Sequence, residues 1–302
     1  MNALGIIYAV ITVLAWGSWL APSQNVPMKG QQTRTFYVTL AVMMLAFVAS
    51  MFVGFEGLNA STFWFPVLGG LIWSLSGWSA FIGANRLGMA KAFGIWAPMN
   101  IVVAIIWGII LFNEFMDIEL VNLLLAILAL ILIIGGILMI ILAGGSKSEN
   151  QKKKVNVGGL LGAMGAGIGF ATYFIPIQIG TANNPVFNMW IGTLPLSIGM
   201  FAGSSILMLV TKSSVKLEKG SHYVRVMSTG FLWAIGNYGA LAMMEIIGTG
   251  KGFTISQLCV VVNALIGIYI LKEPHPKSKA ARLTLLGVII AMTGAILLGN
   301  IS

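Results

Sequence analysis

Residues 70–93, GLIWSLSGWSAFIGANRLGMAKAF, match residues 230–253, GFLWAIGNYGALAMMEIIGTGKGF, at a constant offset of 160 positions and without a gap. The matches that identify this repeat are Gly70 with Gly230, Trp73 with Trp233, Gly88 with Gly248, Lys91 with Lys251, and Phe93 with Phe253. In a strongly apolar chain, two copies of one segment indicate a membrane protein built by duplication. A functional site is therefore expected between the two copies.

The composition places the chain in a membrane. Of its 302 residues, 58% are hydrophobic and only 8% are charged, which is too little polar surface for a domain of this size in water. A helix needs about 20 apolar residues to cross the bilayer core. Stretches that meet this length lie at roughly residues 3–22, 34–54, 64–84, 92–112, 120–143, 157–179, 185–210, 223–246, 252–271 and 283–299. We expect an all-α polytopic membrane protein with ten transmembrane helices.

A second set of matches divides the chain into two halves. The first and sixth predicted spans correspond at an offset of 154, and the pairs are Gly5 with Gly159, Trp19 with Tyr173, Pro22 with Pro176, and Gln24 with Gln178. Residues 1–143 then form a first five-helix repeat, 144–156 a polar cytoplasmic linker and 157–302 a second five-helix repeat. Because each half has an odd number of spans, the second copy is inverted in the membrane.

The distribution of charge predicts the orientation. The net charge of +9 and the run Lys152–Lys154 could suit a nucleic-acid partner, but the loops after odd-numbered spans and the adjoining helix ends hold every Lys and Arg except Lys251. Short loops with this bias mark the cytoplasmic face. We therefore expect the lipid bilayer, and no nucleic acid, as a partner. The protein is expected to be integral to the cytoplasmic (inner) membrane, with both termini outside. A homodimer is left open.

Other chemistry finds little support in the sequence. The single cysteine, Cys259, lies in an apolar span, which excludes a disulfide or cysteine-based metal framework. The segment 245–252 ends in Gly-Lys-Gly, whereas a phosphate-binding loop requires Gly-Lys-Ser or Gly-Lys-Thr. The spans offer no pair of nucleophile and base. We expect no metal, no cofactor and no enzyme activity.

Three features give the chain a family resemblance. The Ala15-Trp16-Gly17-Ser18 opening, the Trp233-to-Asn237 passage and the Phe253-to-Gln257 passage resemble those of the glucose/ribose porter branch of the drug/metabolite transporter superfamily. The resemblance implies ten short helices in two inverted halves and a sugar uptake carrier, with proton coupling. Relatives in the superfamily carry rhamnose, nucleotide sugars, amino acids or drugs. The segment 247–251 lacks the Asn before Lys of nucleotide-sugar carriers, which argues against that substrate.

A transported sugar needs amides and hydroxyls for its polar groups and aromatic faces for its C–H surface. Polar groups at membrane depth face the protein interior or a cavity. The residues predicted to bind substrate are Trp16, Trp78, Asn85, Trp96, Asn100, Tyr173, Asn237 and Gln257. For Asn237, a hydrogen bond between helices is an equal alternative, and for Asn100 and Gln257 a bond to a neighbouring helix is the other interpretation. For Trp73 and Trp233, packing or an interfacial position is the preferred interpretation.

Lys91 and Lys251 occupy equivalent positions in the repeat and would lie at opposite membrane faces. Glu245 is the one carboxylate near the end of a span rather than in a loop, and it could pair with Lys251. The three residues are predicted to act in gating or coupling, while an interfacial ion pair of little energetic value is the alternative.

The sequence therefore predicts a secondary transporter that moves a sugar or similar small polar solute by alternating access, in the direction of uptake. Since no carboxylate lies at mid-span, a facilitator is as compatible with the sequence as a proton-coupled carrier. The alternative function is export of amphipathic or cationic compounds, for which Glu245 would be the candidate acid.

Overall fold

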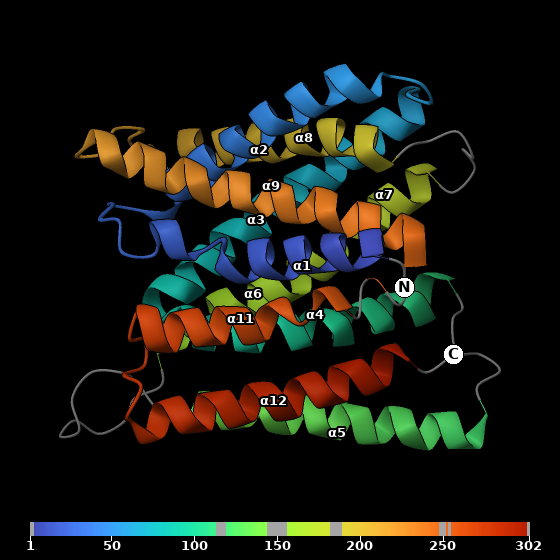
Figure 1. Ribbon diagram of the computed structural model, residues 1–302. Helices are drawn as coiled ribbons and strands as arrows, with labels where there is room; N and C mark the ends of the chain where they lie inside the picture. Colours follow the sequence, from blue (N-terminus) through green and yellow to red (C-terminus); the bar gives the residue numbers. More distant parts are fainter. Residues whose placement is uncertain are drawn as a thin grey trace.

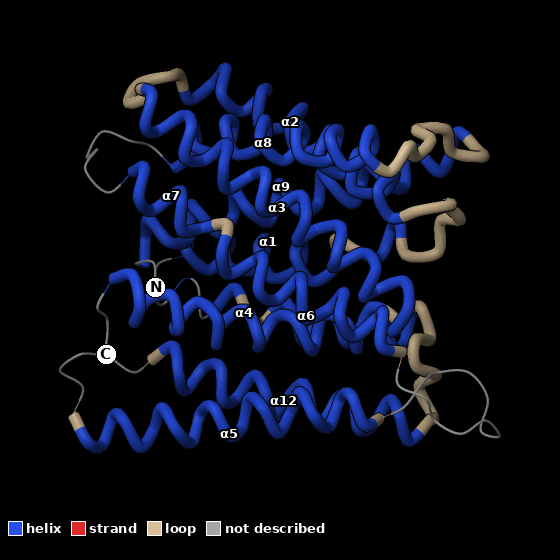
Figure 2. Tube along the Cα trace, turned by 180° about the vertical axis from the view of Figure 1, so that it is seen from behind, coloured by secondary structure: helices blue, strands red, loops and turns tan. Residues whose placement is uncertain are grey.

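The computed structural model describes residues 3–112, 119–143, 156–181, 189–247, 252 and 255–300, and within these ranges the chain forms helices, turns and loops but no strands. The helices are α1 (Ala3–Ser18), η1 (Ala21–Ser23), α2 (Gln31–Val53), α3 (Ala60–Leu87), α4 (Met89–Phe112), α5 (Leu120–Leu142), α6 (Val157–Thr172), α7 (Phe174–Thr181), α8 (Met189–Val210), α9 (Gly220–Ile247), α11 (Cys259–Leu265), η2 (Ile266–Ile270) and α12 (Lys279–Gly299). The long helices run side by side as one bundle (Figures 1 and 2). The expected all-α class is confirmed.

Eight helical segments of the described chain are long and apolar enough to cross a membrane. They account for eight of the ten predicted spans. The predicted span at 223–246 falls in α9, a 28-residue helix that carries Arg225, Asn237 and Glu245. The predicted span at 252–271 coincides with a shorter apolar helix, Cys259–Ile270. The protein is a multi-pass membrane protein, and the count of ten spans stays a prediction.

The two proline positions that the repeat pairs have different local structures. Pro22 lies in η1, a short 3-10 helix that follows the end of α1 at Ser18. Pro176 is the third residue of α7, where proline is tolerated because the first turn of a helix has no internal acceptor for that amide. Each proline thus follows a break in its helix.

Loops rich in lysine gather at one end of the bundle. α1 begins and α12 ends at one side, and the segments 19–30, 211–219 and 271–278 lie at the opposite side (Figure 1). Each of these three segments carries lysine. We call this side the basic end and the other side the terminal end.

The helices are held together where small residues let backbones meet. α3 packs on α6 and α8, α9 packs on α1 and α2, and α5 packs on α12. A Cβ atom on Gly70 would overlap the carbonyl oxygen of Leu196 in α8, and a Cβ on Gly230 would overlap that of Val38 in α2. Between lipid-embedded helices, close backbone approach replaces the hydrophobic driving force that water supplies elsewhere.

The outer pair α5 and α12 depends on the same feature. A Cβ on Gly136 would lie 2.6 Å from the amide nitrogen of Ala291 and 2.7 Å from its Cβ, whereas a Cβ on Gly135 would meet nothing within 4 Å. Two adjacent glycines of one helix therefore differ only in whether another helix touches them.

We predict that Gly136→Ala lowers stability by about 1 to 3 kcal/mol, because backbone atoms of α12 cannot yield as a flexible side chain would. Gly135→Ala is the matched control and should keep or slightly raise stability, since alanine is the better helix former. The melting temperature of the protein in detergent measures both. Equal melting temperatures for the two variants would contradict the packing described for α5 and α12.

Candidate functional site

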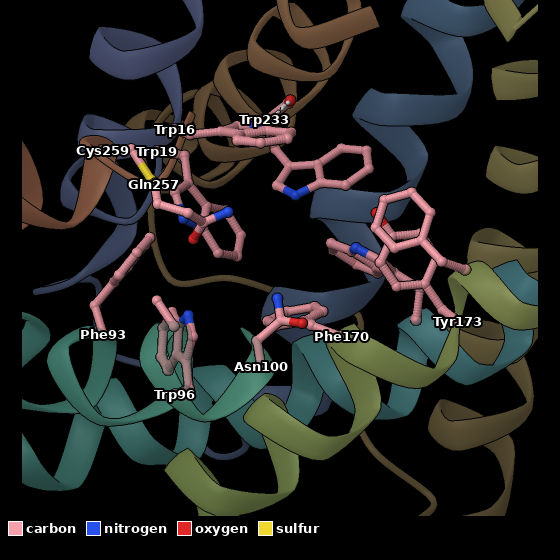
Figure 3. A pocket seen from close by; sticks show the side chains of 13 residues that line it. Trp16, Trp19, Phe93, Trp96, Asn100, Phe170, Tyr173, Trp233, Gln257 and Cys259 are labelled. Carbon is pink, nitrogen blue, oxygen red and sulfur yellow. Dashed lines mark hydrogen bonds between the residues drawn. The ribbon is translucent and has the colours of Figure 1, made fainter. Parts of the chain in front are cut away.

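A partly open cavity of about 80 Å³ lies at the centre of the bundle. Its walls come from α1, α3, α4, α6, α7, α9 and α11 (Figure 3). The lining residues are Trp16, Trp19, Trp73, Phe93, Trp96, Ala97, Asn100, Phe170, Tyr173, Phe174, Trp233, Gln257 and Cys259.

The repeat positions Trp73 and Trp233 meet each other at this cavity. Their ring centroids are 4.9 Å apart with the planes inclined at 68°, close to an edge-to-face arrangement. Phe170 packs on Trp73 at 5.7 Å, and Trp16, which is Phe170's counterpart at the offset of 154, donates its indole N–H to the Trp233 carbonyl at 3.1 Å. Corresponding residues of the two halves thus meet at the cavity.

Three polar side chains are directed at the cavity. Asn100 on α4 and Gln257, just before α11, point into the same space from opposite sides (Figure 3). Within the described chain, neither the Asn100 amide nor the Tyr173 hydroxyl forms a hydrogen bond, and the Gln257 amide makes only a long one, 3.4 Å, to Ser256 Oγ. Most of the hydrogen-bonding capacity of these groups is left for a ligand.

The described lining combines aromatic rings and amides without a charged side chain. Nine of its thirteen residues are aromatic. Aromatic faces pack on apolar C–H surface, and a few fixed polar groups orient a bound molecule. Such a site suits a neutral, polyhydroxylated molecule better than an ion.

Residues 7–301 match the family model described as "Sugar transport protein". The chain belongs to this family. A similar relative is "Glucose uptake protein GlcU" of Bacillus subtilis (strain 168), which is 26% identical over 297 residues and matches over 98% of each chain. A solved structure described only as "Crystal structure of protein" has a TM-score of 0.63 at 14% identity over 99% of each chain, which supports the fold alone. The resemblance to a sugar porter branch is confirmed at the level of the sugar transport family.

Of the eight residues predicted to bind substrate, the five that line the cavity are Trp16, Trp96, Asn100, Tyr173 and Gln257. The other three lie elsewhere. Trp78 is half-buried on α3, and Asn85 is exposed near the end of the same helix. Asn237 is buried on α9, where its Nδ2 donates to Thr193 Oγ1 on α8 at 3.2 Å. This bond corresponds to the alternative of a hydrogen bond between helices.

Of the three residues predicted to act in gating or coupling, the two that the structure describes, Lys91 and Glu245, do not line the cavity. Lys91 is only 4% exposed on the first turn of α4, next to the turn that joins α3 to α4. Glu245 is exposed near the end of α9. Lys251 lies outside the described residues.

Reasoning from the sequence missed many of the aromatic residues that line the cavity. Trp73 and Trp233 were expected to pack or to sit at a membrane interface, and Trp19, Phe93, Phe170, Phe174, Ala97 and Cys259 were not singled out for substrate. The repeat itself contained a usable signal, because Trp73 and Trp233 are its only aromatic pair within the described chain in which both copies have the same residue.

Asn100 and Asn237 should respond differently to the same substitution. We predict that Asn100→Ala leaves the melting temperature in detergent unchanged, because its amide makes no hydrogen bond in the described fold. Asn237→Ala should cost about 0.5 to 1.5 kcal/mol, because it removes the bond to Thr193. A larger loss for Asn100→Ala than for Asn237→Ala would show that Asn100 is a structural residue.

Proposed function

We propose that this member of the sugar transport family is a secondary carrier that moves an uncharged sugar across the cytoplasmic membrane by alternating access, in the direction of uptake. The observation that carries the proposal is the central cavity, where aromatic rings surround the amides of Asn100 and Gln257, which have no strong hydrogen-bond partner in the described chain. The relative whose name specifies glucose uptake supports a monosaccharide as the first substrate to test.

We also propose that residues 1–143 and 157–302 are two inverted five-helix repeats. The pairing of helices supports this, because exchanging the halves maps one set of contacts onto another. The contact of α1 with α9 corresponds to that of α6 with α3, the contact of α1 with α11 corresponds to that of α6 with α4, and that of α2 with α9 corresponds to that of α8 with α3. Gly70 and Gly230, which meet α8 and α2 respectively, follow the same exchange.

Because the two repeats are inverted, corresponding residues would line the path from the cavity to each of the two membrane faces. The substrate enters from one side, rests in the cavity beside the paired rings of Trp73 and Trp233, and leaves when the halves rearrange. Binding energy for the sugar comes from ring stacking and from the amides of Asn100 and Gln257, which have no strong partner in the described chain.

The uncharged lining weighs against export of cationic compounds. A cation site would need an acid facing the aromatic rings, and Glu245, the candidate acid, is exposed near the end of α9 rather than at the cavity. The same lining places no carboxylate of the described chain where a proton relay would meet the substrate. We therefore propose facilitated uptake ahead of proton-coupled uptake.

Purified protein in proteoliposomes should take up labelled glucose or a related neutral monosaccharide, and an inward proton gradient should not raise the accumulated amount above equilibrium. Empty liposomes are the control. Accumulation that depends on the gradient would replace facilitation with proton coupling. Transport of organic cations without any sugar transport would overturn the proposed substrate class.

Asn100→Ala and Gln257→Ala should each raise the KM for sugar by roughly five- to tenfold, as expected for loss of about 1 kcal/mol of hydrogen bonding. Asn85→Ala is the matched control, because Asn85 is an asparagine exposed away from the cavity. Unchanged kinetics in both cavity variants would contradict the assigned site.

The proposed topology places the basic end in the cytoplasm and both termini outside. A cysteine in place of exposed Lys216, in a Cys259→Ala background, should react with an impermeant maleimide in inside-out vesicles and not in intact cells. A cysteine in place of exposed Glu56 should give the opposite result. Labelling of the Lys216 position in intact cells would reverse the orientation.

A further inference from the structure

A cluster of polar groups around the buried side chains of Gln24 and Arg34 lies at the basic end, outside the cavity. Gln24 is only 4% exposed, and its Nε2 donates to the Ala84 carbonyl at 2.7 Å and to Glu273 Oε2 at 3.0 Å. Arg34 is fully buried, and its Nη2 donates to the Gln24 carbonyl at 3.4 Å. Arg225 Nε donates to the Pro22 carbonyl at 2.8 Å. These bonds fix the segment that follows α1 from several sides.

The cluster lies directly behind one wall of the cavity. Trp19 lines the cavity and packs on Phe81, with ring centroids 5.5 Å apart. The Arg34 guanidinium carbon lies 5.4 Å from the centroid of the same Phe81 ring. Trp19, Phe81 and Arg34 are all buried. A continuous layer of side chains therefore separates the cavity from the basic end.

The equivalent layer toward the terminal end is looser. On the basic side, Leu20, Gln24, Phe81 and Ala84 are all buried. Their counterparts at the offsets of 154 and 160 are Phe174, Gln178, Leu241 and Met244. Of these, Gln178 is exposed and the other three are half-buried. Because these positions correspond to each other in the proposed repeat, we attribute the difference in burial to the conformation of the molecule.

We propose that the structure is an outward-facing state in which the basic end is a closed gate, and that the hydrogen bond from Gln24 to Glu273 is the latch of this gate. The proposal rests on the proposed carrier function and on the orientation that goes with it. It assigns gating to Gln24, Arg34 and Glu273.

The latch joins the two halves of the chain. Gln24 belongs to the segment after α1, while Glu273 lies in the connection from η2 to α12. The Glu273 backbone is itself held, because its amide donates to the Gly267 carbonyl at 2.8 Å. Gly88, at the turn between α3 and α4, lies close to Glu273: its φ is +85°, and a Cβ there would lie 3.0 Å from Glu273 Cβ. The halves cannot separate at this end without breaking the bond to Gln24.

The native thiol of Cys259 provides the test, because it is the chain's single cysteine and it lines the cavity. A charged, impermeant methanethiosulfonate is applied to intact cells and to inside-out vesicles, and the rate of modification is measured from each side. In the unmodified sequence the reaction should be faster from outside. Gln24→Ala and Glu273→Ala should each raise the rate from the cytoplasmic side by roughly three- to tenfold, as loss of the hydrogen bond between Gln24 and Glu273 predicts.

Two variants control for the role of the latch. Gln178→Ala alters the repeat counterpart of Gln24, which is exposed, and should leave the cytoplasmic-side rate unchanged. Glu273→Gln keeps an acceptor oxygen for the Gln24 amide and should raise that rate less than Glu273→Ala. Equal rates from the two sides in the unmodified protein, or no increase in either latch variant, would overturn the proposal.

Hydrogen–deuterium exchange supplies a second readout if the thiol reacts from neither side. The amides of Ser23, Gln24 and Val26 are hydrogen-bonded within their own segment and should exchange faster in Gln24→Ala and Glu273→Ala. Unchanged exchange in both variants would overturn the latch. Neither measurement requires transport, so a protein that shows the expected changes but moves no sugar would refute the proposed substrate and leave the gate standing.

Discussion

The close approach of helix backbones at glycine is the constraint on which the whole structure depends. Lipid is as apolar as the side chains it surrounds, so helices in a membrane gain little from burying leucine against leucine. At Gly70, Gly230 and Gly136, the neighbouring helix occupies the space in which a Cβ would lie. These crossings bring helices of the first half against helices of the second half. The cavity exists because aromatic side chains then fill, but do not close, the space between the helices.

The same constraint separates structural polarity from functional polarity. Asn237, Asn263 and Gln24 donate hydrogen bonds to atoms of other segments, and each therefore contributes to holding helices together. Asn100 and Tyr173 leave their polar atoms unpaired toward the cavity within the described chain. Burial of an amide is thus no sign of its role in this protein. The useful criterion is whether the fold already uses its hydrogen bonds.

The fold class followed from composition and hydropathy because lipid permits few architectures. The site was harder to predict. Trp16, Trp96, Asn100, Tyr173 and Gln257 could be chosen from depth and residue type, but Asn237 has the same depth and type and binds Thr193 instead. That distinction depends on which residue of α8 faces α9, and no pattern in a single sequence contains it. The cluster that contains buried Arg34 and half-buried Glu273 was missed for a similar reason, since both residues look in the sequence like ordinary charges in or near the loops of the basic end.

The aromatic wall of the cavity also has an optical consequence. Five of the nine tryptophans in the chain line this one space, and two of them, Trp73 and Trp233, are in contact. The near-ultraviolet emission of the protein therefore originates largely from the surface that a ligand would cover. The molecule carries an intrinsic reporter of its own occupancy, placed there by the same rings that make the binding surface.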